Sequence, residues 1–183
     1  MIRNCMKRIL FNLIKLLALC FRLVSNKLYM YVIVLAYKVN GAKITGMPAY
    51  IDYSAHVDTS GGLTISKGVG ISVNAIVLTH DWSFLRRYRA RNIKFPPKKI
   101  LDPQAFKPVF IDEYSLVGAG AIVLPGTRIG KYCLIGSGAI VKGVIEDYAI
   151  VVGNPARKIG DTRDERFKLV VENYNKAYDG SFN

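Results

Sequence analysis

The sequence predicts an all-β solenoid, a parallel β-helix built from very short strands, and three observations support this fold class. From Ile111 the chain reads IDEYSL, VGAGAI, VLPGTR, IGKYCL, IGSGAI and VKGVIE, six hexads in strict register that each open on a β-branched aliphatic residue. Neither an amphipathic helix nor an alternating strand has a period of six. Glycines recur at the second or fourth place of four hexads, where the corners of a coil need unusual backbone angles. We expect the aliphatic residue to point inward once per side of the coil.

Composition divides the 183 residues into three parts. Residues 1–43 form an apolar N-terminal segment, residues 44–160 form the β-helix, and residues 161–183 form a C-terminal helix and tail. The hexads begin irregularly, with two extra residues at Thr59-Ser60-Gly61-Gly62. The period is absent from residues 83–108, which are basic, aromatic and rich in proline. A long insertion without structure inside a repeat is usually functional, so this stretch is predicted to be a functional excursion loop.

The net charge of +13 is concentrated in two stretches. Residues 1–43 hold eight Lys or Arg and no acid, and residues 83–108 hold eight against one Asp102, which leaves −2 for the rest. This favours anionic partners at two surfaces over a general polyanion, and no nucleic-acid partner is predicted. The cysteines are few, odd in number and widely spaced, which indicates a reducing, cytoplasmic compartment.

The N-terminal segment predicts an amphipathic helix. On a wheel of 100° per residue, its polar stripe lies within about 80°. The stripe consists of Asn4, Arg8, Asn12, Lys15, Arg22 and Asn26. Lys15 and Arg22 interrupt the apolar run, which argues against a spanning helix or a signal peptide. We therefore expect residues 1–40 to contact the membrane surface peripherally; the alternative is a helix packed on an oligomer or a partner protein. Residues 28–39 suit either a second interfacial helix or a first strand.

The sequence holds two histidines, His56 and His80. Two are too few for a zinc site of three imidazoles, and no metal is predicted. His80 stands where the coil gives way to the basic loop, on a rigid scaffold beside a flap. That is a suitable place for a general base working near neutral pH.

The hexads, together with the stretches ISVNAIVLTHDW and VVGNPARKI, resemble the hexapeptide-repeat acyltransferases. Within that family the chain is most similar to the O-acetyltransferases of capsule, O-antigen and other surface-polysaccharide sugars. The resemblance covers residues 44 to 160. It implies a left-handed β-helix with three hexads per coil, a homotrimer, and active sites between neighbouring subunits. It also implies acetyl-CoA as the co-substrate and a sugar or glycan as the acceptor.

The resemblance also implies a role for particular residues. His80 matches the catalytic base that takes the proton of the acceptor hydroxyl. Asp58 matches an acidic residue that orients the imidazole, with Asp81 as a rival. The residues that match the contacts to the coenzyme are Ala119, Gly120, Ser137, Lys142 and Arg157. Of these, Ala119 and Gly120 supply the backbone beside the thioester, and Lys142 and Arg157 face the nucleotide phosphates.

Three functions are compatible with these features. The leading one is a cytoplasmic-face, acetyl-CoA-dependent O-acetyltransferase acting on a surface glycan, including a lipid-linked one. The second is an N-acetyltransferase of an amino nucleotide-sugar, which has no need of the apolar N-terminus. The third is a non-catalytic β-helix trimer that acts as a scaffold at the membrane.

Overall fold

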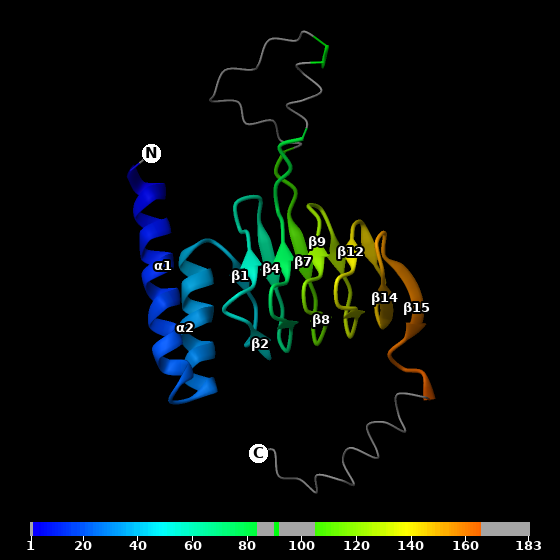
Figure 1. Ribbon diagram of the computed structural model, residues 1–183, viewed down its shortest axis with the longest axis horizontal. Helices are drawn as coiled ribbons and strands as arrows, with labels where there is room; N and C mark the ends of the chain where they lie inside the picture. Colours follow the sequence, from blue (N-terminus) through cyan, green and yellow to red (C-terminus); the bar gives the residue numbers. More distant parts are fainter. Residues whose placement is uncertain (1, 84–89, 92–104, 166–183) are drawn as a thin grey trace, which may run out of the picture.

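The computed structural model describes residues 2–83, 90–91 and 105–165, and it places a helical hairpin at one end of a stack of short strands (Figure 1). The strands form three sheets, which the chain visits in turn, so that each circuit adds one strand to each sheet. The first sheet contains β1 (Lys43–Ile44), β4 (Leu63–Ile65), β7 (Val109–Ile111), β10 (Arg128–Ile129) and β13 (Val144–Ile145). The second contains β2 (Tyr50–Ile51), β5 (Gly70–Ile71), β8 (Leu116–Val117), β11 (Leu134–Ile135), β14 (Ala149–Val152) and β15 (Arg157–Asp161). The third contains β3 (His56–Val57), β6 (Ile76–Val77), β9 (Ile122–Val123) and β12 (Ile140–Val141).

The strand pairs are parallel and in register, except for the last one. Ile65 pairs with Ile111, and Ile71 pairs with Val117, so the irregular first coils align with the regular hexads. β15 runs antiparallel to β14 and ends the second sheet. The parallel strands expected from the hexads are therefore confirmed for the described residues.

The aliphatic residue that opens each hexad forms the core, as the period predicts. These residues are Ile111, Val117, Val123, Ile129, Ile135 and Val141, and none is more than 1% exposed. Because the side chains of successive strand residues point to opposite faces, the neighbouring residues turn toward the surface. The six-residue period thus reports the buried aliphatic side chain that opens each side of the coil.

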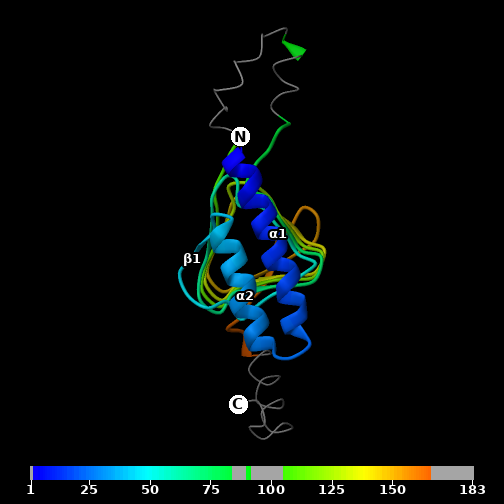
Figure 2. The same ribbon diagram turned by 90° about the vertical axis from the view of Figure 1, so that its left-hand side faces the viewer.

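The hairpin consists of α1 (Ile2–Arg22) and α2 (Asn26–Val39). It covers the N-terminal end of the stack, and Figure 2 looks onto the two helices along that direction. Ser25 caps α2 by accepting a hydrogen bond from the Leu28 N–H. The Tyr29 hydroxyl donates to the Ile51 carbonyl at 2.7 Å, which ties α2 to β2. Residues 28–39 thus lie in a helix, which decides between the helix and the strand that the sequence allowed.

In the described part of the chain, no helix combines the length and the apolarity needed to cross a bilayer. Most of the basic 83–108 loop lies outside the described residues, and so does most of the C-terminal helix and tail expected from residue 161. Asp161 itself is the last residue of β15.

Candidate active site

His80 lies at the base of the 83–108 excursion, just after β6. The residues just before the excursion pair with its last residues: His80 forms an antiparallel bridge with Phe106. The Asp81 N–H donates to the Ala105 carbonyl at 2.7 Å, and the Lys107 N–H donates to the Thr79 carbonyl at 2.9 Å. The His80 backbone is therefore held rigidly, while its imidazole lies beside the rings of Trp82 and Phe106, with centroids 6.1 and 6.3 Å away.

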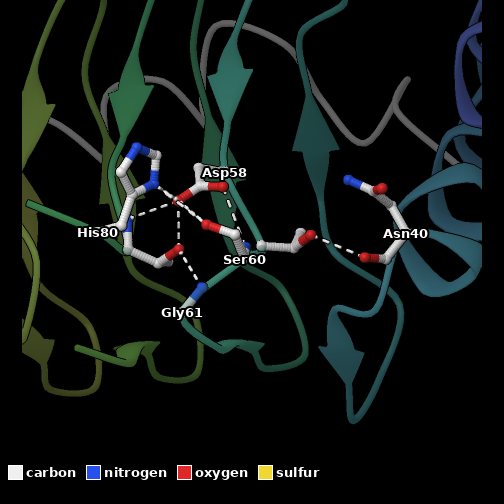
Figure 3. A network of polar contacts seen from close by, with 7 residues as sticks. Asn40, Asp58, Ser60, Gly61 and His80 are labelled. Atoms are coloured by element: carbon white, nitrogen blue, oxygen red, sulfur yellow. Dashed lines mark hydrogen bonds and ion pairs between the residues drawn. The ribbon is translucent and has the colours of Figure 1, made fainter. Parts of the chain in front are cut away.

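Asp58 comes from the turn that follows β3, the strand next to β6. Because Val57 and Val77 are in register, the residues that leave these two strands emerge side by side. The result is a contact of 2.7 Å between His80 Nδ1 and Asp58 Oδ2 (Figure 3). The structure therefore brings together the two residues predicted to be the base and its orienting acid.

The Asp58 carboxylate accepts hydrogen bonds from two further residues. The N–H of Ser60 donates to Oδ1 at 3.0 Å, and the Ser60 hydroxyl donates to Oδ2 at 3.0 Å. Thr79 donates both its N–H, at 3.1 Å, and its hydroxyl to Oδ2. Burial alone would raise the pKa of Asp58, but the hydrogen bonds from Thr79, Ser60 and His80 outweigh it and hold that pKa well below its ordinary value.

The ionised state of Asp58 determines how the imidazole of His80 is used. A carboxylate only accepts hydrogen bonds, so Nδ1 of His80 must carry the proton that it shares with Asp58. The lone pair of the neutral ring is then on Nε2, the nitrogen not engaged by the carboxylate. The His80 side chain is 31% exposed, so a substrate proton has access to it. This arrangement is suited to general-base chemistry.

Asp81, the rival orienting residue, points elsewhere. Its carboxylate accepts a hydrogen bond from the Ser83 N–H at 2.8 Å. That bond, with the nearby cations Lys107 and Lys142, lowers the pKa of Asp81. Asp58 is therefore the acid that contacts His80.

The residues predicted to contact the coenzyme lie mostly at another edge of the coil. Ala119, Gly120 and Ser137 occupy the turns that lead from the second sheet into the third, and the Gly138 N–H donates to the Ala119 carbonyl at 2.9 Å. Arg157 opens β15, opposite Val152. Lys142, in contrast, leaves β12 at the same edge as His80. One side of the coil, six residues at about 3.3 Å each, separates the two edges by up to about 20 Å.

Two residues of the polar network, Ser60 and Thr79, are missing from the sequence prediction. Thr79 is fully buried, and its hydroxyl also accepts the Gly61 N–H at 2.8 Å. A threonine at a position where the alternation calls for a core residue is a signal of such a bond. Ser60 belongs to the turn in which two extra residues interrupt the hexad period. That interruption is the sequence signal that could have identified it as a site residue.

No group of three or more His, Cys, Asp or Glu suited to a metal ion occurs among the described residues. A cavity of about 390 Å³ lies where α2 meets the turn before β2, and is lined by Lys27, Met30, Tyr31, Met47 and Tyr50 among others. It does not include His80.

Comparison with known families gives a match over the regular hexads. Residues 108–143 match the model of the bacterial transferase hexapeptide (six repeats). This confirms the resemblance to the hexapeptide-repeat transferases that the hexads suggested.

Curated relatives match less than half of the chain. A 2,3,4,5-tetrahydropyridine-2,6-dicarboxylate N-acetyltransferase from Ligilactobacillus salivarius is 42% identical over 79 residues, which is 42% of this chain and 34% of that protein. A protein of the same name from Staphylococcus aureus is 31% identical over 75 residues, or 39% and 31% of the two chains. The matched stretch thus spans about a third of the length of these relatives.

Two solved structures share the fold over most of the chain. A maltose O-acetyltransferase from Clostridium difficile has a TM-score of 0.54 and 18% identity, and the match covers 88% of this chain and 89% of that one. A hexapeptide-repeat containing acetyltransferase from Vibrio cholerae has a TM-score of 0.53 and 17% identity, with 88% and 94% covered. At these identities the likeness concerns the fold alone.

Proposed function

Because residues 108–143 carry the hexapeptide repeat of bacterial transferases, we propose that this chain is an acetyl-CoA-dependent O-acetyltransferase. Its acceptor is a hydroxyl of a surface-polysaccharide sugar of the capsule or O-antigen type. The observation that carries the proposal is the 2.7 Å contact between His80 and Asp58, which leaves Nε2 of a fixed imidazole available as a base. We also propose that the β-helix formed by the hexads is left-handed.

In the proposed reaction, His80 Nε2 accepts the proton of the acceptor hydroxyl as its oxygen attacks the thioester carbonyl of acetyl-CoA. The new C–O bond forms the acetyl ester, the C–S bond breaks, and the proton on Nε2 passes to the leaving sulfur. Asp58 stabilises the transient imidazolium and keeps its orientation. The backbone N–H of Ala119 faces the developing oxyanion, while Lys142 and Arg157 face the phosphates of the coenzyme.

A homotrimer completes this site. Ala119 lies at the end of the third sheet where its strands begin, and His80 lies at the end where they finish. One chain therefore presents the base, and a neighbouring chain presents the turn that holds the coenzyme. A ring of identical subunits joins two different edges at every interface. The division into residues 1–43, 44–160 and 161–183 then separates a docking segment, a catalytic coil and a tail.

We further propose that the enzyme works at the cytoplasmic face of the cell membrane. Residues 1–43 contain eight Lys or Arg and no acid, which suits a surface of anionic lipids. There the enzyme meets glycans that are still attached to their lipid carrier.

A second candidate function is N-acetylation of an amino sugar nucleotide. It is favoured by the relatives that match residues of this chain at 42% and 31% identity, since both are named N-acetyltransferases. The same base serves either reaction, because an amine also loses a proton on acylation. The acceptor atom therefore has to be identified chemically.

The test is acetyl transfer from acetyl-CoA to extracted cell-surface glycans and to amino sugar nucleotides, followed by mass spectrometry. His80→Ala is expected to lower the rate by a factor on the order of 10²–10⁴. His56→Ala is the matched control, because His56 is the other histidine and is exposed on β3, and it should keep the rate.

Alkaline hydroxylamine removes an acetyl ester and leaves an amide, so it distinguishes the two candidates. Wild-type rates for His80→Ala would overturn the mechanism. Failure of the protein to bind acetyl-CoA would favour the scaffold reading.

A further inference from the structure

Helix α1 has apolar residues on two sides: Phe11 and Ala18 pack against the core, and a second apolar side points away from the rest of the protein. On a wheel of 100° per residue, six large apolar residues fall within about 120°. They are Met6, Ile9, Leu10, Leu13, Leu16 and Leu17, each between 47 and 64% exposed. An apolar stripe on a helix normally faces the core, so a second stripe that points outward indicates a partner.

Two cations of the polar stripe, Lys15 and Arg22, contact the coil. The Lys15 ammonium lies 4.8 Å from the ring centre of Tyr53, and the Arg22 guanidinium lies 3.8 Å from the Asp52 carboxylate. Burial lowers the pKa of Lys15, and the nearby Asp52 offsets part of that effect. These contacts fix the rotation of α1 about its axis, so the outward direction of the leucines is built into the fold.

The turn and α2 extend the apolar surface. Leu23 and Val24, in the turn between the helices, are 91 and 80% exposed, and Tyr31 and Leu35 of α2 are each 53% exposed. With the six residues of α1 they form what we call the outward face of the hairpin. Figures 1 and 2 show that the hairpin stands at the end of the stack, where no strand of the described residues covers it.

Charge identifies the partner. The exposed cations around the outward face include Lys7, Lys27 and Lys38, and residues 1–43 contain no acid. A second copy of the hairpin would bring two acid-free segments together, which like-charge repulsion opposes. Anionic lipid headgroups neutralise the cations, while their acyl chains receive the leucines and the lysine stems reach up to the phosphates.

The active site is close to this hairpin. Asp58 and His80 belong to the two coils nearest α2, since β3 and β6 are the first strands of the third sheet. The Thr59 hydroxyl donates to the carbonyl of Asn40, the C-cap of α2, at 2.8 Å (Figure 3). With helices about 10 Å in diameter and strands about 4.8 Å apart, the His80 ring stands on the order of 20 Å above the outer side of the hairpin.

We infer that the outward face of the α1–α2 hairpin lies in the headgroup region of an anionic bilayer, so that the coil stands on its N-terminal end. The Asp58–His80 pair then faces glycans carried by lipids of that same membrane. The choice of acceptor rests on the proposed acyltransferase function, whereas the docking of the hairpin does not.

Flotation of the full chain with vesicles tests the docking. The wild-type protein should float with vesicles of phosphatidylcholine and phosphatidylglycerol, and much less with phosphatidylcholine alone. The combined change Leu13→Gln, Leu16→Gln and Leu17→Gln should lower the vesicle-bound fraction at least about tenfold, because it removes apolar area from the lipid contact. The circular dichroism spectrum should stay unchanged, since the three side chains are exposed.

The matched control is Val144→Gln with Ile159→Gln, which removes two residues, 73 and 62% exposed, far from the hairpin. It should float like the wild type. Equal flotation of the triple variant, or no binding of the wild type to either vesicle, would overturn the docking. So would a larger wild-type assembly in solution that the triple variant splits, because the face would then join copies of the chain.

The acceptor is tested with one glycan offered either on vesicles as a glycolipid or free in solution. The wild type should prefer the vesicle-borne form, and the triple variant should lose that preference while it keeps its rate on the free glycan. Equal use of both forms by the wild type would contradict a membrane-borne acceptor. His80→Ala should lose both reactions and still float, which separates failure of the proposed function from failure of the docking.

Discussion

At the residue scale, the reactivity of His80 depends on how completely Asp58 is engaged. Ser60 and Thr79 donate to its carboxylate through both backbone and side chain, and His80 Nδ1 approaches it at 2.7 Å. The carboxylate thus stays ionised and fixed in one orientation. Its orientation in turn sets the tautomer of the imidazole, as in the acid–base pairs of acyl-transfer enzymes.

Asp58→Asn is expected to reduce acetyl transfer by a factor on the order of 10²–10⁴. An asparagine can turn an N–H toward Nδ1, which would move the ring proton to Nε2 and remove the base. Steady-state rates with acetyl-CoA measure this. Asp81→Asn is the matched control. Asp81 adjoins His80 in sequence, but its carboxylate accepts a hydrogen bond from Ser83, so the acetyl-transfer rate of this variant should stay near that of the wild type. Equal losses in the two variants would contradict the assignment.

The pH dependence of stability reports the same network. Because the pKa of Asp58 lies below its ordinary value of 3.8 in the folded state, its stabilising effect is full above that value. The effect is lost as the pH falls through the lower, folded pKa. At neutral pH, Asp58→Asn should cost about 1.5–3 kcal/mol of unfolding free energy. Urea unfolding at decreasing pH should show the two proteins converging below about pH 4, whereas a constant difference would contradict the shift.

The resemblance to the hexapeptide-repeat family was enough to predict His80 and Asp58 as a pair, but the bonds that position them could not be predicted from the sequence. Ser60 reaches Asp58 only because the extra residues of the turn fold back on it, and Thr79 reaches it from the neighbouring coil. Adjacent residues on a strand point to opposite faces, so the sequence already disfavoured Asp81 as the partner of His80. Choosing Asp58 over Asp81 as the partner of His80 required the register of β3 and β6.

At the element scale, the turns of the coil differ in how closely the next coil approaches. A Cβ on Gly118 would lie 2.6 Å from the Ile135 carbonyl oxygen and 2.8 Å from the Ser137 nitrogen, both backbone atoms. At Gly120 the backbone has a positive φ of +65°, and no atom lies within 4 Å of a Cβ. Asn74 occupies the equivalent turn one coil earlier with a φ of 55°. One glycine is thus required for space and the other for backbone conformation.

Gly118→Ala should therefore destabilise the protein by about 1–3 kcal/mol, because the backbone of the next coil has to shift. Gly120→Asn, the matched control in the same turn, should cost less, because asparagine tolerates positive φ and Asn74 already does so. Thermal unfolding monitored by circular dichroism compares the two. A larger loss for Gly120→Asn would contradict this account of the turn.

Another element, a column of tyrosines at one corner, was not foreseen. The Tyr114 and Tyr132 rings stack with centroids 5.3 Å apart, and Tyr132 and Tyr148 stack at 5.2 Å. All three have positive φ, which is unusual for a bulky residue. The Arg163 guanidinium closes the column over Tyr148 at 4.2 Å. The recurrence of Tyr at the fourth place of the hexads IDEYSL and IGKYCL was a visible signal, but the stack itself appears only once the coil is formed.

The N-terminal segment shows what periodicity can and cannot predict. The wheel of residues 1–26 correctly separated the polar stripe from the apolar arc, but it could not tell which side faces the protein. The coil supplies Tyr53 and Asp52 as partners for Lys15 and Arg22. With these contacts in place, the part of the apolar arc that contains Ile9, Leu13 and Leu16 points outward. Such partners are distant in sequence, so the rotation of α1 depends on tertiary contacts.

At the scale of the whole molecule, the third sheet separates the two halves of the proposed site. In a parallel sheet, the turns that precede the strands lie together at one end of the sheet, and the turns that follow the strands lie together at the opposite end. Ala119 lies in the turn before β9, whereas His80 lies just after β6, the strand that pairs with β9. A site that needs both must therefore be assembled from two chains.

Mixing two inactive variants tests this directly. His80→Ala lacks the base, and Ala119→Trp should block the coenzyme at the other edge, so each homogeneous protein should be inactive. In randomly mixed trimers, a working interface joins His80 of one chain to Ala119 of the next. If each interface draws its chains independently, about a quarter of the interfaces should be intact. Refolding or coexpressing the two variants together should therefore restore about a quarter of the wild-type rate. If both halves came from one chain, the mixture would stay as inactive as its components.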